Sequence, residues 1–327
     1  MSSALVNGIT IGYDDSEDRG NGEGEGVPSS RTAPSMPTTP SIRTASPGRT
    51  ASSATPGADP RPTPLLLVHG HPFDRTMWCP QTAAFGAGRR VIAPDLRGYG
   101  RTSVRQGSTG LDVFARDLAG LLDTLGVDRV VVCGLSMGGQ IVLEFHRLFA
   151  ERVAGLVLAD TFAQGETPQG RRERYARAEE LERDGMDGYA HAVLDSMVAP
   201  ATVRDRPEVA AHVLGMMRAA PPAGAAAALR GRAERPDYTP TLARIAVPTL
   251  VVVGRDDVFT PVADARFLHE RVAGSRLVIV EGAGHMPNLE RPDAFNAALA
   301  DLLAAVPEAA EGTATGPGSR PASATAS

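Results

Sequence analysis

The stretch of sequence that decides the fold is Gly134-Leu135-Ser136-Met137-Gly138-Gly139. It directly follows an apolar run at residues 130–133 and directly precedes a helical pattern over residues 140–149. A G-x-S-x-G sequence between a strand and a helix puts its serine at the tip of a sharp, strained turn. The flanking glycines permit this turn, because residues without a side chain let the strand and the helix approach closely. The pattern therefore predicts that Ser136 is a nucleophile presented at a strand–helix junction.

Apolar runs of strand length alternate with helical patterns on both sides of this junction. Strands that are buried on both faces are continuous apolar runs, whereas a helix carries its apolar residues three and four positions apart. We expect strands at residues 65–69, 91–93, 130–133, 156–159, 250–253 and 277–280, and helices at 114–125, 140–149 and 295–303. This alternation predicts an α/β protein with a mostly parallel central sheet.

The chain divides into six expected segments. They are an N-terminal strand or hairpin (1–13), a disordered low-complexity insertion (14–62), the first part of the α/β core (63–160), a helical cap (161–241), the second part of the core (242–307) and a disordered tail (308–327). Asn7-Gly8 is the turn signal of the hairpin. The insertion and the tail have almost no large apolar residues, so they cannot bury enough surface to offset the entropy of ordering.

The cap interrupts the strand–helix rhythm after the sixth strand. Its sequence is charged and Ala-rich, and it contains no convincing strand pattern. Because it follows one core strand and precedes the next, we expect it to lie over the carboxyl edge of the sheet, where such sheets bind ligands. The Arg/Glu run from Arg171 to Arg183 is interpreted as a solvated helix face.

Composition limits the classes of function. The net charge is −5 without a clustered basic face, so no nucleic-acid partner is expected. All 33 Lys and Arg residues are arginines, which is typical of a G+C-rich coding sequence. There is no apolar run of membrane-spanning length and no signal-peptide pattern, so we expect a cytoplasmic protein without a membrane partner. Cys79 and Cys133 do not have metal-ligand spacing, and no metal or cofactor is expected.

Two loops after later strands carry partners for a serine nucleophile. Asp256 and Asp257 follow the strand at 250–253, and His285 follows the strand at 277–280. Both loops would lie at the same edge of the sheet as Ser136. An imidazole takes the serine proton during attack and returns it to the leaving group, and a carboxylate orients the imidazole. The chain order nucleophile, acid, base is one of the known orders for such a triad.

These motifs together resemble the α/β-hydrolase superfamily, in particular its small bacterial esterases, enol-lactonases and cofactor-free haloperoxidases. The resemblance rests on Leu65-Leu66-Leu67-Val68-His69-Gly70-His71-Pro72, Ala93-Pro94-Asp95-Leu96-Arg97-Gly98-Tyr99-Gly100, the stretch 134–139, the stretch 254–261 and Gly282-Ala283-Gly284-His285. It covers residues 64–160 and 245–306, and therefore the core; the cap carries no motif of this kind.

The resemblance implies roles for further residues. The backbone N–H groups of Met137 and His71 would form the oxyanion hole. Relatives often have a bulky apolar or aromatic residue at the His71 position, so this histidine leaves the polarity of the pocket open. Its side chain either points into the pocket or is a partly exposed loop residue. His69 is expected to orient the oxyanion loop by hydrogen bonds, and Asp95 is expected to hold the neighbouring loop.

The triad acid has two candidates. Asp257 fits the G-x-x-D spacing that the family shows after this strand, whereas its neighbour Asp256 would point away or cap the next turn. Asp160 ends the strand after the Ser136 helix, where some relatives carry the acid instead. We take Asp257 as the predicted acid, with Asp160 as its rival.

The sequence thus predicts a serine hydrolase with the triad Ser136, Asp257 and His285. It would cleave a small-molecule carboxylic ester, thioester or lactone through an acyl-enzyme intermediate. Two alternatives keep the fold: a cofactor-free haloperoxidase or perhydrolase that uses the same triad, and a non-catalytic ligand-binding protein. A serine nucleophile argues against haloalkane dehalogenases and epoxide hydrolases, which carry an aspartate at this position. The substrate and the oligomeric state stay open.

Overall fold

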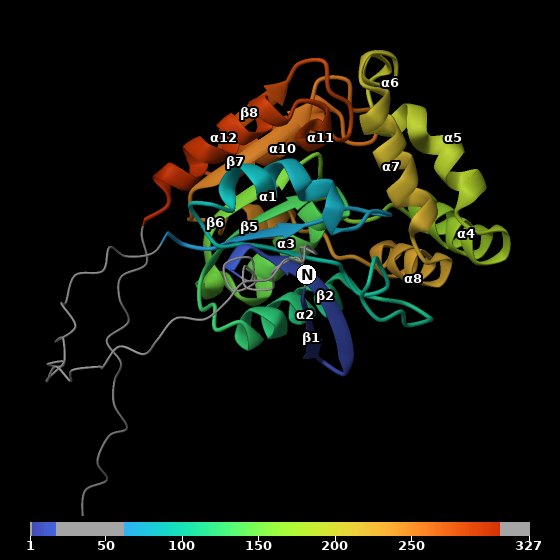
Figure 1. Ribbon diagram of the computed structural model, residues 1–327, viewed down its shortest axis with the longest axis horizontal. Helices are drawn as coiled ribbons and strands as arrows, with labels where there is room; N and C mark the ends of the chain where they lie inside the picture. Colours follow the sequence, from blue (N-terminus) through green and yellow to red (C-terminus); the bar gives the residue numbers. More distant parts are fainter. Residues whose placement is uncertain (1, 18–61, 308–327) are drawn as a thin grey trace, which may run out of the picture.

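An eight-stranded sheet forms the centre of the computed structural model, which describes residues 2–17 and 62–307 (Figure 1). Its strand order is β1-β2-β4-β3-β5-β6-β7-β8. The strands are β1 (Ser2–Val6), β2 (Ile9–Asp15), β3 (Leu65–Val68), β4 (Val91–Pro94), β5 (Val130–Leu135), β6 (Val153–Ala159), β7 (Thr249–Gly254) and β8 (Arg276–Val280). Only the pairs β1–β2 and β2–β4 are antiparallel among these strands, which confirms the predicted mostly parallel sheet.

Helices cover both faces of the sheet. One face carries α1 (Cys79–Phe85) and α12 (Pro292–Ala305), and the other carries α2 (Leu111–Thr124), α3 (Met137–Leu148) and α10 (Val262–Arg271). Val132 of β5 packs in the same core as Phe114 of α2. Its neighbour Val131 points to the opposite face and packs in the same core as Phe295 of α12. Both faces of the strands are therefore buried, which explains their continuous apolar sequences.

The N-terminal hairpin forms as the Asn7-Gly8 signal predicts, with φ of 48° and 73° at these two residues. One boundary was wrong, because the expected insertion began at residue 14 and β2 continues to Asp15. Two acidic residues assigned to the expected insertion form ion pairs within the fold. Asp14 pairs with Arg75 at 3.1 Å, and Asp15 pairs with Arg90 at 2.8 Å. The remainder of the expected insertion (18–61) and the tail (308–327) lie outside the described residues.

The segment between β6 and β7 is helical throughout its regular structure. It contains α4 (Pro168–Asp184), α5 (Asp187–Met197), α6 (Pro200–Asp205), α7 (Pro207–Ala219), α8 (Pro222–Ala233) and α9 (Thr239–Leu242). The helices α4–α8 gather at one end of the molecule (Figure 1). α4 packs on α8, and α5 packs on α7. From here on, the cap means the helices α4–α8, which lie within the predicted cap segment 161–241.

Three short helical segments complete the described structure. They are η2 (Arg75–Trp78), η3 (Ala150–Arg152) and α11 (Pro287–Glu290). Trp78 is buried and its ring lies 6.0 Å from the ring of Phe295, so it packs in the core. Over residues 2–17 and 62–307, no helix combines the length and the apolar character needed to cross a membrane.

Candidate active site

Five neighbouring parallel strands end at one edge of the sheet with polar side chains. His69 and His71 follow β3, Ser136 follows β5, Asp160 follows β6, Asp257 follows β7 and His285 follows β8. The carboxyl ends of parallel strands share an edge, and this is where α/β sheets bind ligands. The loops that the sequence selected are therefore brought together by the topology of the sheet.

Ser136 lies on the sharp turn that the sequence predicts, with φ of 58° and ψ of −116°. A β-carbon added to Gly134 would lie 2.2 Å from a carbonyl oxygen of Gly138, and one added to Gly138 would lie 2.2 Å from a carbonyl oxygen of β3. The Ser136 N–H donates to the Ala159 carbonyl at 2.9 Å, and the Thr161 hydroxyl donates to the Ser136 carbonyl at 2.7 Å. These contacts hold a backbone conformation that costs about 1–3 kcal/mol.

His285 is paired with Asp257. Its Nδ1 lies 2.8 Å from Oδ2 of Asp257, and both side chains are buried. Asp257 also accepts hydrogen bonds from the backbone N–H groups of Phe259 and Thr260 and from the Thr260 hydroxyl. Burial alone would raise the pKa of Asp257, but the His285 charge and these hydrogen bonds outweigh it and lower that pKa. An ionised Asp257 holds the proton on Nδ1 and leaves Nε2 as the acceptor.

Asp160 lies beside this pair without replacing Asp257 in it. One side-chain atom each of Asp160, Asp257 and His285 lies within 4.8 Å of the others. Oδ1 of Asp160 accepts the Gly254 N–H at 2.9 Å. Burial, and next the charge of Asp257, raises the pKa of Asp160 well above its ordinary value, so its neutral form is favoured. The three groups have the spacing of a metal site, but the Asp257 oxygens already accept protein hydrogen bonds.

The loop after β3 lies directly against Ser136. A β-carbon added to Gly70 would lie 3.3 Å from the β-carbon of Ser136. His69 holds this loop, because its Nε2 accepts the Leu96 N–H at 2.9 Å and its Nδ1 donates to the Gly70 carbonyl at 2.8 Å. Burial lowers the pKa of His69, which agrees with this neutral tautomer. The hydrogen bonds are those expected of a residue that orients the loop.

The loop after β4 is held by ion pairs, as expected for Asp95. Asp95 accepts hydrogen bonds from the backbone N–H groups of Arg75 and Arg101, and it forms an ion pair with the Arg75 guanidinium at 2.6 Å. Arg97 pairs with Asp117 of α2 at 2.7 Å. These contacts fix the backbone next to His69.

The two predicted oxyanion donors are Met137, which follows Ser136 in the sequence, and His71, which lines the same cavity as Ser136. Met137 is the first residue of α3, so its N–H has no partner within the helix. His71 is buried, and its Nδ1 lies 2.7 Å from the Tyr99 hydroxyl, so the exposed-loop interpretation of this histidine is wrong. Burial and the charges of Arg232 and Arg174 hold the pKa of His71 well below its ordinary value. The ring is therefore neutral.

A cavity of about 490 Å³ joins these groups to the cap. Ser136, His285 and His71 line it from the core, and Phe162, Glu166, Glu173, Arg174, Arg177, Tyr189 and Arg232 are among the residues that line it between β6 and β7. The Ser136 hydroxyl and the His285 ring, both among the described residues, form no hydrogen bond with each other. A hydrogen bond between a nucleophile and its base often tightens only when substrate is bound.

The interpretation of the arginine run as a solvated face was wrong in part. Arg174 and Arg177 of α4 line the cavity, and Arg174 pairs with Glu166. A helix in contact with the core has one solvated side and one inner side, and the sequence of α4 is too uniformly polar to separate the two.

Glu290 is a residue of this region that the sequence did not single out. It is fully buried at the end of α11. One carboxylate oxygen accepts the N–H groups of Gly284 and Met286, which flank His285, at 2.9 and 3.1 Å. The other accepts the Ala199 N–H and the Thr202 hydroxyl of the cap, both at 2.7 Å. Its position in a Pro-Asn-Leu-Glu turn gives no local signal of these contacts.

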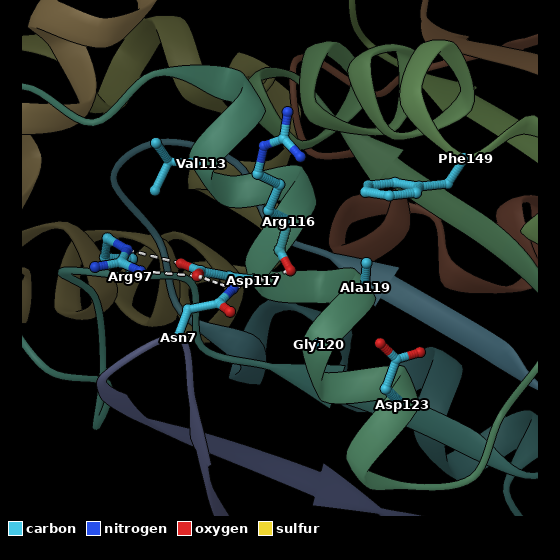
Figure 2. A pocket seen from close by; sticks show the side chains of 9 residues that line it. All are labelled: Asn7, Arg97, Val113, Arg116, Asp117, Ala119, Gly120, Asp123 and Phe149. Atoms are coloured by element: carbon cyan, nitrogen blue, oxygen red, sulfur yellow. Dashed lines mark hydrogen bonds and ion pairs between the residues drawn. The ribbon is translucent and has the colours of Figure 1, made fainter.

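A second hollow, of about 400 Å³, lies between the hairpin turn and α2 (Figure 2). Asp117, one of its acidic residues, already accepts hydrogen bonds from Arg97 and from Asn7 (Figure 2). None of the predicted site residues lines this hollow. The cavity with Ser136 is therefore the candidate active site.

Comparison with known proteins identifies the family of this chain. A model described as "Alpha/beta hydrolase family" matches residues 65–298. The chain belongs to the alpha/beta hydrolase family. This α/β hydrolase is 32% identical over 251 residues to 3-oxoadipate enol-lactonase 2 of Acinetobacter baylyi, covering 76% of this chain and 91% of the relative. The predicted family and fold class are thus confirmed.

Solved structures of similar hydrolases match most of the length of this chain. A thermophilic esterase from Thermogutta terrifontis, determined with malate bound, has a TM-score of 0.77 and 32% identity, covering 93% of this chain and 98% of that one. The enol-lactonase from Burkholderia xenovorans LB400 has a TM-score of 0.74 and 27% identity, covering 93% of this chain and 100% of that one.

Proposed function

We propose that this α/β hydrolase cleaves a carboxylic ester, thioester or lactone through a covalent acyl-enzyme. The observation that carries the proposal is one cavity lined by Ser136 on its strained turn and by His285, whose Nδ1 is paired with Asp257. The relatives named as an esterase and as enol-lactonases support the ester and lactone classes.

The proposed reaction begins with attack of the Ser136 hydroxyl oxygen on the substrate carbonyl. Nε2 of His285 accepts the hydroxyl proton and then donates it to the leaving oxygen, while Asp257 stabilises the charged ring. The amides of His71 and Met137 donate to the oxyanion, and each such donor contributes roughly 10²–10³ to turnover. Water, deprotonated by the same Nε2, then attacks the acyl-enzyme and releases the acid.

The first test is covalent labelling. A fluorophosphonate probe should label the wild-type chain, and the Ser136→Ala variant should lose both the label and about 10⁶-fold in turnover. Turnover is measured on p-nitrophenyl esters of increasing acyl length and on small lactones. A wild-type chain that neither takes up the probe nor hydrolyses any of these substrates would leave the non-catalytic binding protein as the better account.

A second comparison of rates separates hydrolysis from perhydrolysis. We expect ester cleavage without hydrogen peroxide to exceed peroxide-dependent bromination in acetate. The opposite order would favour the haloperoxidase alternative, which uses the same three side chains.

A further inference from the structure

One buried cation in the cavity has no counter-ion among the residues that the structure describes. Arg232 lies in α8, is only 8% exposed and lines the cavity that contains Ser136. Its Nε donates to Oε1 of Gln140 at 3.1 Å. No carboxylate of the described residues pairs with its guanidinium. Since Gln140 occupies only Nε, the two terminal nitrogens are left to a ligand.

The other arginines near the cavity each have a carboxylate partner. Arg174 and Arg235 share the carboxylate of Glu166. Arg177 pairs with Glu180 at 2.7 Å. Arg232 therefore differs from these neighbours, because it pairs with no carboxylate of the described residues.

Leaving this guanidinium without an anion is unfavourable. A buried charge loses its hydration and is normally paired. Burial, and next the charges of Arg174 and Arg235, lowers the pKa of Arg232, which shows that the cation is destabilised where it lies. A guanidinium nonetheless keeps its proton in proteins. An anion in the cavity would offset this cost.

His71 is a second cavity residue with a polar atom that lacks a partner. Its Nε2 is buried and has no hydrogen-bond partner among the described residues. His71 and Arg232 both line the cavity, one from the loop after β3 and the other from the cap. Two independent elements thus contribute residues with unsatisfied polar atoms to the lining of one ligand volume, next to the proposed nucleophile.

We propose that the substrate carries a free carboxylate, which binds the terminal nitrogens of Arg232 while its ester or lactone carbonyl lies at Ser136. This inference rests on the proposed function and adds the class of substrate. Arginine binds planar carboxylates through two parallel hydrogen bonds. Glu173 also lines the cavity and forms no ion pair among the described residues, which favours a substrate with a single negative charge over a dianion.

The test compares pairs of substrates that differ only in charge. The p-nitrophenyl half-esters of glutaric, adipic and pimelic acids are set against the p-nitrophenyl esters of methyl-terminated acids of the same length. We expect the wild-type chain to favour a half-ester in kcat/KM. In Arg232→Met the ratio of half-ester to neutral ester should fall by roughly 10- to 100-fold, as expected for a lost charged hydrogen bond.

Two further variants separate charge from packing. Arg232→Lys keeps the charge without the planar fork, so it should retain part of the preference. Arg230→Met is the matched control, because Arg230 lies on the same helix but pairs with Glu182 at 2.6 Å and does not line the cavity. Its ratio should equal that of the wild type.

A binding measurement removes the dependence on turnover. Calorimetry with monomethyl glutarate should show binding to Ser136→Ala and loss of binding to Ser136→Ala with Arg232→Met. Hydrolysis of both substrate types at equal rates, with a ratio unchanged in Arg232→Met, would overturn the anionic subsite alone. Absence of hydrolysis and of Ser136 labelling would overturn the proposed function instead.

Discussion

Asp257 and Asp160 are neighbouring carboxyl groups that the fold holds in opposite protonation states. Asp257 receives hydrogen bonds from His285, Thr260 and two backbone amides, and its pKa is lowered. Asp160 is buried next to that negative charge, and its pKa is raised. Two close carboxylates cannot both ionise without strong repulsion, so the one that accepts more hydrogen bonds takes the charge.

The neighbouring residues Asp256 and Asp257 allow a test of the proposed triad acid. Asp257→Asn should reduce turnover by about 10⁴, because an amide cannot hold the required imidazole tautomer. Asp256 is exposed and provides the matched control. Asp256→Asn should behave as the wild type in the same ester assay; equal losses in the two variants would remove Asp257 from the proposed triad.

Asp160→Asn tests the neutral carboxyl. The raised pKa of Asp160 adds stability at pH below its ordinary value of 3.8, and this contribution is lost as pH rises through the folded-state pKa. The lowered pKa of Asp257 has the opposite effect: it contributes stability at higher pH, and this contribution is lost as pH falls. The Asn side chain has no proton to lose. The stability of the Asp160→Asn variant relative to the wild type should therefore improve from mildly acidic to mildly alkaline pH.

The measurements are urea unfolding at both pH values and ester turnover at the higher one. The Asn variant should keep most of its turnover, since its side-chain oxygen can still accept the Gly254 N–H. A loss as large as that of Asp257→Asn would instead identify Asp160 as the acid.

These residues differ in how far the sequence could predict them. Ser136, Asp257 and His285 follow apolar strands, and a strand with its loop is a local pattern. The unsatisfied guanidinium of Arg232 could not be predicted, because it depends on which cap helix faces the cavity. The same holds for the inward-facing ring of His71, whose burial is set by the cap and by Tyr99.

At the scale of elements, the cap is tied to the loop that carries His285. Glu290 of α11 accepts hydrogen bonds from Gly284 and Met286 on one side and from Ala199 and Thr202 on the other. The His285 N–H also donates to the carbonyl of Met197 in α5, at 3.1 Å. The position of the proposed base thus depends on helices far from it in the sequence.

Glu290→Gln should weaken this link. A glutamine replaces one acceptor oxygen by an N–H donor, so at least one buried backbone N–H loses its partner. We expect a loss of about 1–3 kcal/mol in unfolding free energy and a lower kcat on p-nitrophenyl esters, since the His285 loop shifts.

Glu281→Gln is the control for this variant. Glu281 lies just before the same loop but is 70% exposed and pairs with Arg255 at the surface, so its unfolding free energy should change by less than about 0.5 kcal/mol. A Glu290→Gln variant that is destabilised but has unchanged kcat would contradict the coupling of α11 to catalysis.

The core elements were predictable from the sequence and the arrangement of the cap was not. Buried strands require apolar runs, so their positions and the order of the loops can be inferred from the chain alone. α4 has only Ala178 and Leu181 buried, and the side that lines the cavity includes Glu173, Arg174 and Arg177. A hydrophobic pattern cannot indicate which way such a helix faces. Asp14 and Asp15 were misassigned for a related reason, because their arginine partners are distant in sequence.

At the scale of the whole molecule, the core and the cap contribute different properties to one cavity. The core supplies the proposed nucleophile, base, acid and oxyanion amides from the ends of neighbouring strands. The segment between β6 and β7 supplies the charged and aromatic walls. Chemistry and substrate choice are therefore encoded in separate stretches of sequence that meet only after folding.

The contacts of Glu290 bear on any attempt to retarget this hydrolase by transplanting a cap. Exchanging residues between β6 and β7 for the corresponding helices of a relative would bring a new recognition surface. It would also strip the Glu290 carboxylate of the Ala199 and Thr202 donors, and leave the histidine loop without its anchor. A working chimera must carry its own pair of donors at that point, so the graft is defined by these hydrogen bonds and not by the boundaries of the helices.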